Sequence, residues 1–256
     1  MERGLLLVTV HVVCVLTCLL LPVLTWPESF FDLVTEGDAA TVQAALDAGT
    51  DPEARGEDGY TPLMTAAGHN ENTAVVQALL DAGADVAART EHGMTSLMEA
   101  APYNDNAKVV QALIDAGADL EVTNLDGYRA LTLATEYNEN AAVVQALINA
   151  GAMLDVATWY SLPDLLIAAR HNPTPGVMQA FLDAGADLEA RGEDGWTALM
   201  YAAHYNDSSV VQALIDAGAD AAATNADGES AWDLIQENEA LKEPAAYWAL
   251  KDLRFQ

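Results

Sequence analysis

The chain has 256 residues, and its 39 acidic side chains against 10 basic ones give a formal net charge of −29 at pH 7. This balance argues against binding of nucleic acid, because phosphate backbones are bound by Lys and Arg side chains, and it disfavours anionic membrane surfaces. Both cysteines, Cys14 and Cys18, lie near the N-terminus. Disulfides and cysteine-ligated zinc are therefore excluded from the rest of the chain.

The first feature along the chain is an apolar segment from Leu5 to Leu24, with Arg3 ahead of it. Its length is close to that of a membrane span, and its position is typical of a secretory signal. We expect residues 1–26 to be a signal peptide or, if uncleaved, a membrane anchor that is the chain's only membrane contact. By the positive-inside rule the remainder lies outside the cytoplasm, either periplasmic or secreted, or tethered to the membrane.

Everything after this segment is built from one repeated unit. An Ala-Gly pair recurs at a spacing of 34 residues, shortened to 33 at the last step, with its glycine at Gly49, Gly83, Gly117, Gly151, Gly185 and Gly218. Repetition with a period in the low thirties indicates a solenoid. In a solenoid each unit packs on its neighbours, so no central core is needed.

Each unit is predicted to be a turn followed by two helices. Asp58-Gly59 is a tight-turn pair, and Thr61 caps the next helix with Pro62 at its first position. The second helix carries an apolar stripe from Val75 to Leu80 at helical spacing. It ends at Gly83, because glycine adopts the left-handed conformation without penalty.

This unit resembles the ankyrin repeat in Gly59-x-Thr61-Pro62-Leu63, in Ala66-Ala67 and in the closing Leu80-Asp81-Ala82-Gly83-Ala84-Asp85. The resemblance covers residues 28–256 and implies an all-α ankyrin-repeat solenoid whose helix pairs are joined by β-hairpin turns. It divides the chain into an N-terminal capping repeat (27–57), five repeats (58–91, 92–125, 126–159, 160–193, 194–226) and a C-terminal capping repeat (227–256).

Two departures from the family pattern stand out. The family often has His after its Thr-x-Leu, and its turn-to-turn hydrogen bonding is predicted to be lost here because that position holds Met64, Met98, Thr132 and Met200. The fifth turn, Thr158–Pro163, lacks the Asp-Gly pair. It is interpreted as drift, a bend in the stack or a contact point.

No catalytic or metal-binding constellation is predicted. The histidines, His11, His69, His92, His171 and His204, are not near a cysteine and do not have metal-ligand spacing. The acidic pairs at turns belong to separate repeats, where solvated turn residues are the expected reading. We therefore expect a chain that is not an enzyme and that carries no metal and no cofactor.

Aromatic side chains recur directly after the turn glycine and just after the first helix of each pair. The resemblance implies that these places line the concave face with which ankyrin repeats bind proteins, and rigid aromatics are common binding anchors. The alternative is that they pack between repeats and stiffen the stack. The predicted partner-binding residues are Tyr60, Tyr103, Tyr128, Tyr137, Trp196, Tyr201, Tyr205 and Glu99.

Acidic residues beside these aromatics predict a partner with a basic surface, since complementary potentials favour association. The sequence thus predicts a monomeric, exported and non-enzymatic module that binds another protein. The alternative is a membrane-tethered structural or chaperone-like accessory protein of the cell envelope.

Overall fold

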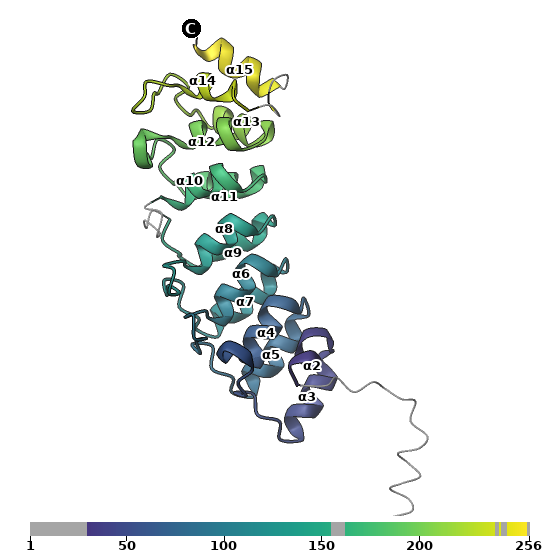
Figure 1. The fold of residues 1–256 in the computed structure, drawn as a ribbon. Helices are drawn as coiled ribbons and strands as arrows, with labels where there is room; N and C mark the ends of the chain where they lie inside the picture. The colour runs from purple at the N-terminus through teal and green to yellow at the C-terminus, as the bar shows by residue number, and fades with distance from the viewer. Residues whose placement is uncertain (1–29, 155–161, 239–240, 242–244, 255–256) are drawn as a thin grey trace, which may run out of the picture.

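The structure, a computed structural model, describes residues 30–154, 162–238, 241 and 245–254 as an elongated stack of helix pairs (Figure 1). The inner helices pack on one another along the stack; they are α2 (Phe30–Glu36), α4 (Pro62–His69), α6 (Ser96–Tyr103), α8 (Ala130–Tyr137), α10 (Asp164–His171), α12 (Ala198–Tyr205) and α14 (Ala231–Ile235). The outer helices form a second layer; they are α3 (Ala39–Asp47), α5 (Thr73–Asp81), α7 (Ala107–Asp115), α9 (Ala141–Asn149), α11 (Pro175–Asp183), α13 (Ser208–Asp216) and α15 (Ala245–Arg254).

The all-α solenoid is therefore confirmed. In the described part of the chain the extended connections form no strand, and the β pairing there is an isolated bridge between Thr224 and Ser230. The predicted signal or anchor segment and most of the fifth turn lie outside the described residues. Among the residues that are described, every helix is too short or too polar to cross a membrane.

Local sequence signals set where the helices begin and end. The Thr61 hydroxyl accepts a hydrogen bond from the Met64 amide at 3.2 Å, and Pro62 occupies the first turn of α4. The Asn72 side chain caps α5 in the same way. Gly83 follows α5 with φ of 91°, in the left-handed region that favours glycine. The predicted caps and stop of this unit are confirmed.

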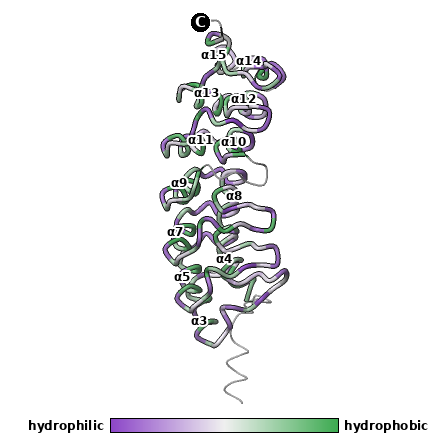
Figure 2. The backbone as a smooth tube through the Cα atoms, turned by 90° about the vertical axis from the view of Figure 1, so that its left-hand side faces the viewer, coloured by the Kyte–Doolittle hydropathy of each residue, from purple (hydrophilic) through white to green (hydrophobic). Residues whose placement is uncertain are grey.

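The core runs the length of the stack between the two helix layers. Val75, Val76 and Leu79 of α5 are fully buried, as are the equivalent Val-Val-Leu side chains of α7, α9 and α13. Figure 2 shows that the helices carry most of the hydrophobic residues and that the loops joining them are mostly hydrophilic. The predicted apolar stripe is thus the surface that holds neighbouring repeats together.

A ladder of asparagines fixes the register of consecutive repeats. One Asn follows each inner helix from α4 to α14, and its Nδ2 donates to two main-chain carbonyl oxygens in the preceding repeat. Asn138, for example, donates to Ala101 at 3.0 Å and to Asn104 at 3.2 Å. The ladder consists of Asn70, Asn104, Asn138, Asn172, Asn206 and Asn238.

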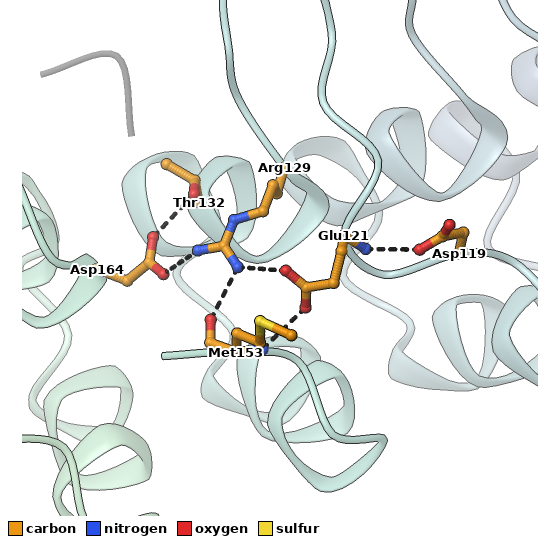
Figure 3. A network of polar contacts seen from close by, with 6 residues as sticks. All are labelled: Asp119, Glu121, Arg129, Thr132, Met153 and Asp164. Carbon is orange, nitrogen blue, oxygen red and sulfur yellow. Dashed lines mark hydrogen bonds and ion pairs between the residues drawn. The ribbon is translucent and has the colours of Figure 1, made fainter. Parts of the chain in front are cut away.

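An ionic network replaces the usual caps at the junction of α8 and α10. Arg129 and Pro163 stand where other repeats have a capping Thr, and neither makes a side-chain cap bond. The Arg129 guanidinium instead bonds the Asp164 carboxylate at 2.8 Å and the Glu121 carboxylate at 2.7 Å (Figure 3). Arg129 and Asp164 are both buried.

Thr132 completes this network, because its hydroxyl donates to Asp164 at 2.8 Å. The expected loss of turn-to-turn bonding is therefore wrong at Thr132, where a threonine hydroxyl joins two repeats. At Met64 the Sδ atom accepts instead from the Thr61 amide of its own repeat, at 3.4 Å. Burial raises the pKa of Asp164 to about 7, even though Arg129 acts in the opposite direction.

Candidate functional site

A row of aromatic rings lies at the C-terminal ends of the inner helices. Tyr103, Tyr137 and Tyr205 are the last residues of α6, α8 and α12, and their side chains are 64%, 57% and 50% exposed. His69 and His171 end α4 and α10 and are also exposed. We call these five residues, one on each of five successive inner helices, the ring column.

Rings of the column contact one another or their neighbours. The His69 and Tyr103 rings stack across one repeat, with centroids 6.3 Å apart. Tyr205 has more aromatic neighbours, because its ring centroid lies 4.4 Å from that of His204 and 6.1 Å from that of Trp196. The column therefore ends, toward the C-terminus, in a packed aromatic cluster.

A cation is part of this cluster. The Arg170 Cζ atom lies 5.0 Å from the centroid of the Tyr205 ring and 6.0 Å from that of Tyr201. The Arg170 Nε is buried and makes no hydrogen bond. The guanidinium is therefore held against ring faces, the arrangement of a cation–π interaction.

The aromatics that follow the turn glycines are less accessible. Tyr60, Tyr128 and Trp196 are half-buried, and Tyr128 and Trp196 pack against the core. The Tyr60 hydroxyl donates to the Glu99 carboxylate at 2.7 Å, and it links one repeat to the next. Burial and this bond raise the pKa of Tyr60, and burial also raises the pKa of Glu99.

The structure thus separates the predicted partner-binding residues into groups. Tyr103, Tyr137 and Tyr205 share one exposed surface. Tyr201 is 7% exposed and Glu99 is 3% exposed, so these two side chains lie inside the stack. Their use by a partner stays a prediction.

Sequence reasoning did not find Arg170. The sequence feature that could have indicated it is its position: Arg170 directly precedes the ring residue of its own repeat, His171. Its side chain contacts Tyr205, the ring residue of the following repeat. A small cavity of about 110 Å³ adjoins it, lined by Glu136, Leu162, Ile167, Arg170 and His171. Burial lowers the pKa of His171, against the opposing charge of Glu136.

The hairpin turns, at the other ends of the inner helices, carry exposed acidic side chains. Asp58, Glu91, Asp126, Glu193 and Asp194 are exposed at the hairpin turns. Within the described ranges, no group of three or more His, Cys, Asp and Glu side chains is placed to hold a metal ion.

Stacked helix pairs with a continuous two-layer core define a helical-repeat solenoid. A family model described as ankyrin repeats (three copies) matches residues 30–124 and 165–240. The chain therefore belongs to the ankyrin-repeat family, whose repeats are a general protein–protein interaction module.

Solved structures with similar folds agree with this family. The ankyrin repeat domain of human ASB11 has a TM-score of 0.70 at 22% identity, over 88% of this chain and 96% of that one. The ankyrin repeat domain of Bcl-3, a member of the IkappaB protein family, has a TM-score of 0.64 at 25% identity, over 87% of this chain and 97% of that one. No curated protein matches this sequence.

Proposed function

We propose that this chain is an exported, monomeric and non-enzymatic ankyrin-repeat protein that binds another protein through the ring column. The observation that carries the proposal is the exposure of Tyr103, Tyr137 and Tyr205 at equivalent ends of inner helices. Exposed aromatics in a contiguous patch are typical of binding surfaces, and tyrosines often dominate the binding free energy.

The charge distribution favours a basic segment as the partner. The net charge of −29 gives the molecule a negative field, and complementary potentials speed and orient association. Several of the few arginines are engaged internally: Arg55 and Arg191 each donate to two main-chain carbonyl oxygens of the following repeat. Arg129 is buried in its ionic network.

A triple variant tests the surface. Tyr103→Ala, Tyr137→Ala and Tyr205→Ala together are expected to weaken binding of the native partner at least about tenfold, because each anchor contributes on the order of 1 kcal/mol or more. The partner is recovered by affinity capture from the native extracellular or envelope fraction, and its affinity for each purified variant is then measured by calorimetry.

The matched control changes exposed polar residues on the outer helices, namely Gln77→Ala, Gln111→Ala and Gln179→Ala. This variant is expected to bind within about twofold of wild type, because contacts outside an interface contribute little. Equal losses in the two triple variants would contradict the proposal. Binding should also weaken as salt is added, since screening acts on exposed charges.

The proposed location outside the cytoplasm rests on the apolar segment from Leu5 to Leu24 and on Arg3 ahead of it. We expect the mature protein to begin near residue 26, which intact mass measurement of the native protein determines. A native protein that retains Met1 or Glu2 and stays in the membrane fraction supports instead the tethered accessory protein. A native protein that retains them and is recovered in the cytoplasm contradicts both forms.

A further inference from the structure

The structure places the Arg170 side chain on a ring of the column, that of Tyr205. Its guanidinium is 5.0 Å from the Tyr205 centroid, and its buried Nε has no hydrogen-bond acceptor. We propose that the ring column binds arginine side chains of the partner by stacking, and that Arg170 occupies the Tyr205 ring in place of one of them. This inference rests on the proposed function and specifies its chemistry.

The repeat register shows why Tyr205 differs from the other tyrosines. In two repeats the residue before the ring residue lies near the ring of the following repeat: Arg170 contacts Tyr205, and Glu136 lines a cavity together with His171. For the two earlier tyrosines, the residue that corresponds to Arg170 in the preceding repeat is uncharged. It is Gly68 for Tyr103 and Pro102 for Tyr137. The chain thus supplies its own cation at Tyr205 and none from this position at Tyr103 or Tyr137.

Arginine suits these rings better than lysine. Its planar guanidinium stacks on aromatic faces and is more weakly hydrated than an ammonium group. The negative field of the molecule further favours a cationic side chain over a neutral one. Because Arg170 and a partner's arginine would use the same ring, Arg170 competes with the partner at Tyr205.

Removal of this competitor is expected to strengthen binding. The probe is a short fluorescent peptide with arginines in a glycine–serine background, titrated against the full-length protein. Arg170→Gln is expected to bind it about three- to tenfold more tightly than wild type, the range of a partly exposed cation–π contact. Arg170→Met, which fills similar space without charge, provides a second variant with the same expected gain.

Loss of a positive charge alone also raises the affinity of an acidic protein for a basic peptide. Lys108→Gln removes the same charge from an exposed position on α7 and is expected to change the affinity less than about twofold at physiological salt. A peptide with citrulline in place of arginine keeps the shape without the charge, and should show no gain. Adding Tyr205→Ala to Arg170→Gln should abolish the gain.

The proposal is overturned if Arg170→Gln and Arg170→Met bind no more tightly than Lys108→Gln, including the case in which none of them binds the peptide. It is equally overturned if the gain persists with citrulline or without Tyr205. If the native partner still depends on Tyr103 and Tyr137 in that case, the proposed function stands and the role of Arg170 alone fails. If the affinity of the native partner does not change when all three tyrosines are replaced, the proposed function fails.

Discussion

Replacing Arg129 with Met is expected to lower the free energy of unfolding by about 3–5 kcal/mol, because it leaves a buried carboxylate without its counter-ion. Asp164 is fully buried and depends on Arg129 at 2.8 Å and on the Thr132 hydroxyl. Arg129 also donates to the Met153 carbonyl oxygen at 2.9 Å, so a further hydrogen bond is lost. Urea denaturation followed by circular dichroism measures the change.

Two companion variants identify the cause. The double variant Arg129→Met/Asp164→Leu is expected to recover most of the loss, since a buried ion pair is often replaceable by apolar side chains.

The second variant, Asp164→Asn, tests how the protonation of Asp164 changes the stability of the fold with pH. Because the pKa of Asp164 is raised to about 7 from an ordinary 3.8, the folded state keeps a proton that the unfolded state releases. The stabilisation is complete below about pH 4 and lost as pH rises through 7.

Wild type should therefore lose stability relative to Asp164→Asn as the pH rises from about 4 to 8, and the difference should level off above that. Comparing these two chains cancels the titration of the many other carboxylates. A wild-type stability that, relative to Asp164→Asn, stays constant or rises with pH would contradict the raised pKa. An Arg129→Met chain as stable as wild type would show that the network carries no net stability.

Leu113→Ala is the second large expected effect, a loss of about 2–5 kcal/mol in the free energy of unfolding. Leu113 is fully buried in α7, where its side chain fills the space between the helix layers. Truncation removes its burial and leaves a cavity, because close-packed surroundings relax only in part. Thermal and urea unfolding both measure the loss.

Gln111→Ala on the same helix is the control. Its side chain is exposed and bonds Asp115 at 2.8 Å, so its removal should change stability by no more than about 0.5 kcal/mol. Equal melting temperatures for Leu113→Ala and wild type would contradict the position of the core.

Most of the fold can be predicted from the sequence because each repeat restates the same local signals. Thr61, Pro62 and Gly83 set the bounds of helices through short-range backbone chemistry, and Val75 to Leu80 mark the buried stripe by spacing. The Arg129–Asp164 network could not be predicted in this way. Its partners are separated by a full repeat, and only the packing of α8 against α10 brings them together.

The candidate site was predicted only in part, for a similar reason. Sequence register places residues on a helix end, but it does not give the direction of a side chain across the stack. Tyr205 and Tyr201 lie one helical turn apart, yet Tyr205 is exposed and Tyr201 is buried. Glu99 was expected to bind the partner, but its side chain is buried and accepts a hydrogen bond from the Tyr60 hydroxyl. Arg170 contacts the ring of Tyr205, which belongs to the following repeat.

The asparagine ladder has a direction. Each rung donates only to carbonyl oxygens that come earlier in the chain: Asn104 uses Ala67 and Asn70, and Asn138 uses Ala101 and Asn104. A polypeptide that emerges from the ribosome or from a membrane channel with its N-terminus first therefore meets the acceptors of every new rung already in place. The stack can be completed in the order in which it is delivered, without waiting for distant sequence.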